Sequence, residues 1–87
     1  MELSWTTKAW EHYLYWQETD KAVLRKLNDL LQECLRTPRT GKGKPEALKG
    51  DLRGCWSRRI TEEHRLVYEI KSERILVLYC RFHYDDK

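Results

Sequence analysis

The stretch from Trp56 to His83, WSRRITEEHRLVYEIKSERILVLYCRFH, decides the fold, because hydrophobic residues recur through much of it at every second position. Side chains two residues apart share a face of a β-strand, so this spacing predicts strands rather than helices. Polar turns at 62–64 and 72–73 separate three such segments. We expect strands at residues 56–61, 65–70 and 74–83.

The alternation also predicts which face of the sheet each side chain occupies. In the last strand the even-numbered positions from 76 to 82 are all apolar, so we expect them in the core. The odd-numbered positions then fall on the opposite face, together with residue 65. That open face is expected to gather Arg59, Arg65, Arg81 and His83.

Upstream of the strands, hydrophobic residues recur at steps of three and four, which is the period of a helix. The pattern runs from Val23 to Leu35, with Asp20 as a suitable N-cap. Pro38 ends it, because the residue before a proline avoids the helical region.

A first helix and a short strand complete the order of elements. Thr6 or Thr7 is a suitable N-cap, after a strand that we expect at residues 1–5. With 87 residues the chain is predicted to form a single domain, 1–87. The predicted fold class is α+β: a two-helix hairpin packed on one face of a small, mainly antiparallel β-sheet, in the order β-α-α-β-β-β.

Residues 39–54, between the helices and the strands, are rich in glycine and lysine, which predicts a loop or a pair of very short elements. Nine basic and four acidic residues lie between Arg36 and Arg65, although the formal net charge of the whole chain is only +3. Such a concentrated patch suits a phosphate backbone, but a solvated loop has the same composition.

Composition excludes several classes of protein. Hydrophobic residues make up 40% and charged residues 36%, which is typical of a folded domain. The longest mainly apolar run, 75–80, is too short to cross a membrane, and the N-terminus does not resemble a signal peptide, so we expect a cytoplasmic location. We expect no metal or cofactor, because the three cysteines are widely spaced and suit simple packing. They are Cys34, Cys55 and Cys80.

An open face with arginines and a histidine has two interpretations. It is either a solvated surface with ion pairs, such as Arg65 with Glu69, or a site that cleaves RNA. RNA carries its own nucleophile, the 2′-hydroxyl, so an enzyme needs only to move two protons and stabilise the phosphate. His83 is a suitable proton donor, and an arginine fork matches phosphate oxygens. Glu46, which stands among lysines, is the candidate base.

Two roles are open to Glu46. The lysines favour its ionised form, which accepts a proton but is a weaker base, and the alternative is that it orients the 2′-hydroxyl or a lysine. Of the other histidines, His12 is expected on the surface of a helix. His64, at a turn, is expected to be structural or to face the substrate rather than to be catalytic. Tyr84, beside His83, is expected to stack on a base, to touch a phosphate or to anchor the chain end.

Four segments resemble YoeB-type toxins of the RelE/ParE superfamily. They are YLYWQETD at 13–20, GKGKPE at 41–46, WSRRITEEHRLVY at 56–68 and CRFHY at 80–84. The resemblance spans nearly the whole chain. It implies the RelE-like fold and a toxin of a type II toxin–antitoxin system, an endoribonuclease that cleaves mRNA in the ribosomal A site and inhibits translation. The implied products are a 2′,3′-cyclic phosphate, or its opened form, and a free 5′-hydroxyl.

The resemblance also implies a role for each candidate residue. Glu46 matches the general base, His83 the general acid, and Arg65 the arginine that stabilises the phosphate. Lys49, Arg59 and Tyr84 match residues that hold RNA, and Lys44 and Arg81 are expected to join them by their charge.

The partners implied by the resemblance are a YefM-like antitoxin, the bacterial 70S ribosome with its mRNA, and a second copy in a homodimer. The antitoxin's disordered C-terminal segment is expected to wrap the toxin and block its site. One departure concerns the tail Asp85-Asp86-Lys87, which extends past the family pattern and places two carboxylates where they repel phosphate.

Two other functions remain open for the same fold, because fold does not determine function. A ParE-like inhibitor of DNA gyrase has no need of a proton donor and acceptor, so the set of Glu46, Arg65 and His83 speaks against it. A module that only docks on nucleic acid would show salt-dependent binding without cleavage.

Overall fold

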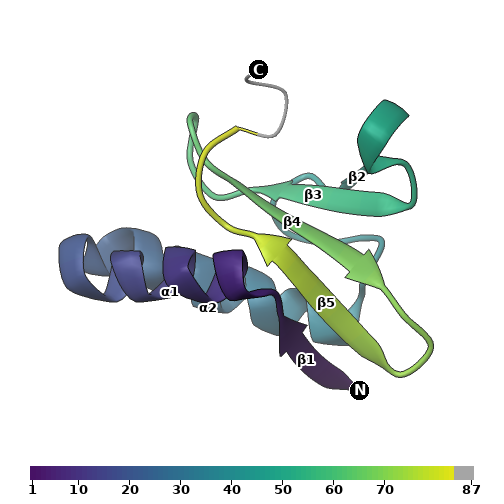
Figure 1. The fold of residues 1–87 in the computed structure, drawn as a ribbon, viewed down its shortest axis with the longest axis horizontal. Helices are drawn as coiled ribbons and strands as arrows, with labels where there is room; N and C mark the ends of the chain where they lie inside the picture. The colour runs from purple at the N-terminus through teal and green to yellow at the C-terminus, as the bar shows by residue number, and fades with distance from the viewer. Residues whose placement is uncertain (84–87) are drawn as a thin grey trace.

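The structure is a computed structural model that describes residues 1–83. Within these residues, two α-helices pack against one face of a five-stranded sheet (Figure 1). The helices are α1 (Thr7–Thr19) and α2 (Lys21–Arg36). The strands are β1 (Glu2–Trp5), β2 (Glu46–Ala47), β3 (Cys55–Arg59), β4 (Arg65–Ile70) and β5 (Arg74–Tyr79), with a 3₁₀ turn η1 (Gly50–Leu52) before β3.

The strands of the sheet lie in the order β1-β5-β4-β3-β2. β1 pairs in parallel with β5, and the other neighbouring strands are antiparallel. The predicted α+β fold, a helical hairpin on one face of a mainly antiparallel sheet, is therefore confirmed. The segment expected as a loop or two very short elements contains two, the two-residue strand β2 and the turn η1.

Local signals in the sequence begin and end the helices. The Thr6 hydroxyl accepts the Ala9 N–H at 3.0 Å and caps α1. The Asp20 carboxylate accepts two N–H groups of the first turn of α2. These caps satisfy amide groups that no helical carbonyl reaches. α2 ends at Arg36, as the proline at position 38 predicts.

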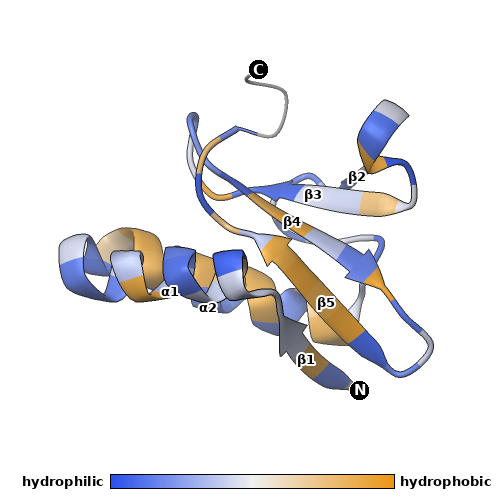
Figure 2. Cartoon of the chain, in the orientation of Figure 1, coloured by the Kyte–Doolittle hydropathy of each residue, from blue (hydrophilic) through white to orange (hydrophobic). Residues whose placement is uncertain are grey.

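One continuous core lies between the helices and the sheet, and Figure 2 shows hydrophobic residues concentrated on β5 and in bands along the helices. Its buried side chains include Ala9, Trp16, Leu27, Leu30, Leu66, Tyr68, Ile75 and Val77. Two large hydrophobic residues of α1, Trp10 and Leu14, lie outside this core and are 46% and 40% exposed. All three cysteines are buried free thiols, as their expected packing role requires.

The predicted faces of β5 are wrong. Ile75 and Val77 are buried in the core beneath the helices, whereas Leu78 packs in a second apolar cluster. Phe82, expected in the core, is 52% exposed. Of the even-numbered residues expected in that core, Cys80 is the one that lies there.

A β-bulge explains the difference. Tyr68 of β4 pairs with Val77 and Val67 pairs with Tyr79, which leaves Leu78 as an extra residue on β5. An inserted residue reverses the alternation of faces, so one strict two-residue pattern cannot fit both sides of the bulge. The predicted pattern is right at Cys80, beyond the bulge, and wrong at Ile75 and Val77, before it. Regular strand structure also ends at Tyr79, short of the expected limit.

The second apolar cluster lies on the face of the sheet opposite the helices, which we call the open face. Its members are Leu48, Cys55 and Val67, with Leu52, Leu78 and Tyr79 packed against them. The segment around η1 contributes the two leucines at 48 and 52 and so covers part of the open face. Among the described residues, neither helix has the length and apolar composition that a membrane span requires.

Candidate active site

Neighbouring strands carry predicted site residues onto the open face. Glu46 on β2 pairs with Ser57 on β3, and Arg59, two residues further along β3, pairs with Arg65 on β4. Directly paired residues share a face of the sheet, as do residues two apart on one strand. Glu46, Arg59 and Arg65 therefore point to the same side. Two strand spacings separate β2 from β4, a distance of roughly 10 Å.

His83 lies next to Arg65 along the chain path that leaves β5. The carbonyl of Phe82, the residue before it, accepts the Arg65 N–H at 3.0 Å. In Figure 1 the chain beyond β5 passes along the turn between β3 and β4. The half-buried His83 thus adjoins the start of β4, and the structure brings the predicted proton donor close to the predicted phosphate-binding arginine.

The turn between β3 and β4 fixes the guanidinium of Arg65, a residue that is only 8% exposed. Its Nη1 donates to the carbonyls of Thr61 at 2.7 Å, Glu62 at 3.1 Å and His64 at 3.2 Å. These bonds orient the cation before any ligand arrives. All three hydrogen bonds are donated by Nη1, so the N–H groups on Nε and Nη2 remain available to bind a phosphate.

Two side chains differ from the arrangement expected on the open face. Glu69, considered as an ion-pair partner of Arg65, pairs with Lys71 at 3.4 Å. The Arg81 guanidinium carbon lies 3.5 Å from the centre of the Tyr15 ring on α1, so its side chain turns toward that helix. The end of regular strand structure at Tyr79 accounts for this direction.

Glu46 lies in an open hollow together with a lysine. The hollow is lined by Glu46, Ala47, Leu48 and Lys49. Glu46 and Lys49 are both exposed, as is Lys44, which has a left-handed φ of 52°. Tyr84, expected to contact RNA, lies outside the described residues.

The loop that leads into β2 is held by a buried arginine that the sequence analysis misses. Arg58 is fully buried, and its Nε donates to the Tyr68 hydroxyl at 3.0 Å. Its Nη atoms donate to the carbonyls of Lys42 at 2.7 Å, Thr37 at 2.6 Å and Thr40 at 2.9 Å. The sequence does contain a signal for this buried role, because Arg58 alternates with apolar residues on the side of the strand that faces the core.

Glu33 of α2 holds the same loop from the other side. Its carboxylate accepts the Arg36 guanidinium at 2.8 Å and the Lys42 N–H at 3.2 Å. These two hydrogen bonds, the one from Arg36 foremost, lower the pKa of the Glu33 carboxyl below its ordinary value of 4.5. The loop before Glu46 is therefore fixed to both the helix and the sheet.

Gly43 is a residue of this loop that tolerates substitution poorly. It has a φ of +83°, its carbonyl accepts the Arg59 N–H at 2.7 Å, and a Cβ there would lie 2.8 Å from Leu30 Cδ2 and 3.1 Å from Arg58 Cβ. We expect Gly43→Ala to lower the free energy of unfolding by about 1–3 kcal/mol, measured by urea denaturation. Gly54→Ala is the control, because that φ is +96° but its Cβ meets nothing. Equal losses in the two variants would contradict the steric argument.

The other two histidines both contact the segment that precedes His83. His64 lies in the turn before β4, as predicted, and its Nδ1 accepts the Phe82 N–H at 2.8 Å. His12, expected on the helix surface, is instead half-buried, and its Nδ1 accepts the Cys80 N–H at 3.1 Å.

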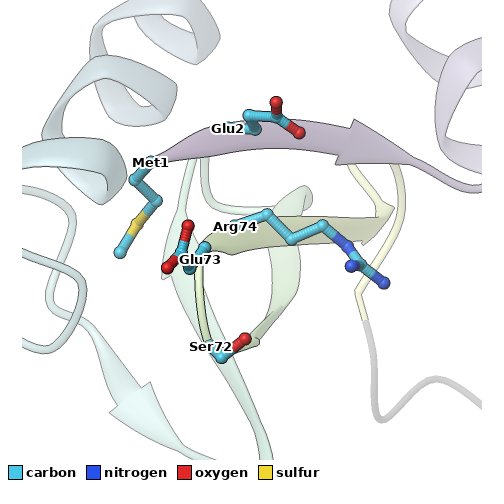
Figure 3. A pocket seen from close by; sticks show the side chains of 5 residues that line it. All are labelled: Met1, Glu2, Ser72, Glu73 and Arg74. Carbon is cyan, nitrogen blue, oxygen red and sulfur yellow. The ribbon is translucent and has the colours of Figure 1, made fainter.

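A second hollow lies at the far end of β5, away from these residues (Figure 3). It is lined by Met1, Glu2, Ser72, Glu73 and Arg74. Because residue 74 begins β5 and His83 follows its opposite end, this hollow does not belong to the site. Within residues 1–83 no group of three or more His, Cys, Asp and Glu side chains is placed to hold a metal ion.

A helical hairpin on a mixed sheet of this strand order is the RelE-like fold. Escherichia coli YafQ shares this fold with a TM-score of 0.77 at 13% identity, over 94% of this chain and 92% of that one. The chain belongs to the family of YoeB-like toxins of bacterial type II toxin–antitoxin systems, whose family model matches residues 5–84.

Individual relatives agree with this assignment over almost the full length. The chain is 56% identical to toxin YoeB of Escherichia coli K12 over 84 residues, which cover 97% of this chain and all of that protein. A YoeB/ParE toxin from Agrobacterium tumefaciens superposes with a TM-score of 0.94 at 52% identity, covering 97% and 100% of the two chains. A chain of the Staphylococcus aureus YoeB–YefM heterotetramer gives 0.88 at 41%, covering 97% and 98%.

Proposed function

We propose that this toxin is a metal-independent endoribonuclease that cuts mRNA in the ribosomal A site and thereby inhibits translation. The observation that carries the proposal is the row formed by Glu46, Arg59 and Arg65 on one face, with His83 beside Arg65. Membership of the YoeB-like toxins agrees with it. A gyrase inhibitor would have no use for a carboxylate and an imidazole arranged around two arginines.

The proposed reaction is an internal transfer. The 2′-hydroxyl attacks the neighbouring phosphorus, the bond to the leaving 5′-oxygen breaks, and a 2′,3′-cyclic phosphate and a 5′-hydroxyl result. Glu46 takes the proton of the attacking hydroxyl, and protonated His83 gives one to the leaving oxygen. Arg65 and Arg59 bind the phosphate oxygens, which carry more negative charge in the transition state. Each aimed donor of this kind contributes about 100- to 1,000-fold.

The second role open to Glu46 is to orient the 2′-hydroxyl without taking its proton. Glu46→Gln separates the two roles, because an amide keeps hydrogen-bonding groups but cannot act as the base. A loss of about 100-fold or more supports the base, which is the scale of one proton-transfer group. A loss of only a few fold supports orientation alone.

The ribosome is proposed to supply the orientation of the RNA. Glu46 and Lys49 are exposed, so the toxin alone surrounds little of its substrate. Positioning the 2′-hydroxyl in line with the scissile bond removes a large part of the activation barrier to cleavage. A codon held in the A site is already positioned. Lys44, Lys49, Arg59 and Tyr84 are the residues proposed to hold the RNA.

We also propose partners and a location by analogy with relatives. Solved structures from Staphylococcus aureus include a YoeB–YefM complex and a YoeB dimer. A YefM-like antitoxin that covers the site and a homodimer are therefore proposed here, and action on ribosomes places the toxin in the cytoplasm. The single domain is proposed to span residues 1–87.

The test is to map mRNA ends in a purified translation system, with and without ribosomes. We expect a cut in the A-site codon, only with ribosomes, that leaves a 2′,3′-cyclic phosphate or its opened form. An mRNA with a 2′-deoxy nucleotide on the 5′ side of the cut should resist, because it lacks the nucleophile. Cleavage of the deoxy substrate would exclude internal transfer, and efficient cleavage of naked RNA would exclude the ribosome requirement. No cut under any condition would lead to a supercoiling assay with DNA gyrase.

A further inference from the structure

The backbone between β5 and His83 is held by side chains from distant parts of the chain. The Cys80 N–H donates to His12 Nδ1 at 3.1 Å, and the Cys80 carbonyl accepts the Trp16 indole N–H at 2.9 Å. The Phe82 N–H donates to His64 Nδ1 at 2.8 Å. Strand pairing ends at Tyr79, so these contacts take the place of a neighbouring strand.

Phe82 is the strained point of this segment. Its φ of 71° lies in the left-handed region, which a bulky residue rarely adopts and which costs about 1–3 kcal/mol. Its side chain is 52% exposed, so burial of the ring does not hold the conformation. Instead, its N–H is bound by His64 and its carbonyl by the Arg65 N–H at 3.0 Å. Two consecutive residues, 64 and 65, therefore grip both polar groups of Phe82.

The hydrogen bonds that His64 and His12 accept from this segment require the two imidazoles to be neutral. A ring nitrogen accepts a hydrogen bond only while it carries no proton, so His64 and His12 must each be neutral, with the proton on Nε2. Protonation would place a hydrogen on Nδ1, where it would face the hydrogen of the backbone N–H group. The hydrogen bond would then be lost. The Trp16 ring packs edge-on against His64 with centroids 4.8 Å apart and fixes the plane of that imidazole.

We propose, on the basis of the proposed function, that His64 is a positioning residue for His83 and that His12 supports it. The neutral His64 ring accepts the Phe82 N–H, keeps Phe82 in its left-handed conformation, and so directs the next residue, His83, toward the phosphate bound by Arg65. His64 itself touches no reacting atom.

Burial, together with the nearby cations, favours the neutral form of the two rings. Burial lowers the pKa of His64 below its ordinary value of 6.5, Arg81 and Arg65 lower it further, and Glu63 opposes them. Burial also lowers the pKa of His12, aided by Arg81, Lys8 and His64 and opposed by Glu11. Arg81 acts on both rings from a fixed position between the Tyr15 and Phe82 rings.

The test compares His64→Asn with His64→Phe under single-turnover conditions at saturating ribosome-bound mRNA. Asparagine offers a carbonyl oxygen close to the position of Nδ1, whereas phenylalanine keeps the ring packing and removes the acceptor. We expect His64→Phe to lose about 10- to 100-fold in cleavage rate, the scale of a small misplacement of a reacting group. His64→Asn should stay within a few fold of the wild type, and the apparent affinity for ribosomes should be unchanged in both.

A substrate with sulfur in place of the leaving 5′-oxygen separates positioning from general damage. A thiolate leaves without needing a proton, so a defect that acts through His83 should largely disappear on this substrate. For the same reason His64→Phe should add little to His83→Ala. A defect in His64→Phe that persists with sulfur, or that multiplies with His83→Ala, would overturn the proposal, as would a His64→Phe enzyme of normal rate.

Nuclear magnetic resonance tests the grip on Phe82 independently of any cleavage. In the wild-type protein we expect nitrogen-15 shifts that place the His64 proton on Nε2 at neutral pH. Protection of the Phe82 amide from exchange should be lost in His64→Phe and retained in His64→Asn. It should also fall as the pH is lowered through the depressed pKa of His64, below 6.5. A protonated Nδ1 at neutral pH would exclude the proposal, and if the protein cleaves nothing this measurement still decides it.

Discussion

Arg58→Met is expected to lower the free energy of unfolding by about 3–5 kcal/mol, a large fraction of the about 5–15 kcal/mol typical of a domain. Methionine fills much of the volume but removes the cationic donor that binds the carbonyls of Thr37, Thr40 and Lys42 and the Tyr68 hydroxyl. Hydrogen bonds from a charged group contribute about 1.5–3 kcal/mol each, and water replaces part of this where it can enter. The measurement is urea denaturation followed by tryptophan fluorescence.

Arg59→Met is the matched control for Arg58→Met. The two arginines are adjacent on β3, but Arg59 is exposed on the open face while Arg58 is fully buried. We expect Arg59→Met to change stability by less than about 0.5 kcal/mol, as exposed substitutions usually do. Similar losses in the two variants would mean that the hydrogen bonds of Arg58 do not hold the loop before β2.

His83→Ala is expected to reduce the rate of A-site cleavage by about 100- to 10,000-fold, the contribution of one general acid. The segment that leads to His83 is fixed by backbone hydrogen bonds at Cys80 and Phe82, so the truncated protein should still fold and bind ribosomes. Single-turnover cleavage of a defined mRNA measures the loss, and thermal unfolding checks the fold.

The substrate with sulfur in place of the leaving 5′-oxygen also tests whether His83 is the general acid. If the imidazole protonates the leaving oxygen, a sulfur leaving group should restore most of the lost rate in His83→Ala. It should restore little in Glu46→Gln, whose defect lies at the attacking hydroxyl. A wild-type rate in His83→Ala, or a defect that sulfur leaves unchanged, would show that His83 is not the acid.

The parts of the fold that could be predicted depend on neighbouring residues alone. The caps at Thr6 and Asp20, the end of α2 before Pro38 and the strand at residues 65–70 are all confirmed, because each signal acts within a few residues. The alternation in β3 also correctly put Arg59 on the open face beside Arg65.

The errors arise where pairing partners lie far apart in sequence. The extra residue Leu78 has no signature of its own, since the bulge exists only in the register between β4 and β5. A single alternation carried through the bulge is therefore right at Cys80 but wrong at Ile75 and Val77. The positions of Arg81 and Phe82 were missed because regular strand structure ends at Tyr79. The contacts of Arg58 and His12 were missed because their partners are backbone groups of remote segments.

The parallel pairing of β1 with β5 has a consequence for how the chain folds. Glu2 lies opposite Arg74, so forming this pair closes a loop that includes most of the described chain. Closing so long a loop costs chain entropy before its contacts form, which slows folding relative to a helical protein of the same size. β5 also lies between β1 and β4 in the sheet. A fragment that ends before Arg74 keeps Glu46 and Arg65 but lacks His83 and the strand that joins β1 to the rest of the sheet. We therefore expect partial synthesis or proteolysis at this point to yield an inactive peptide.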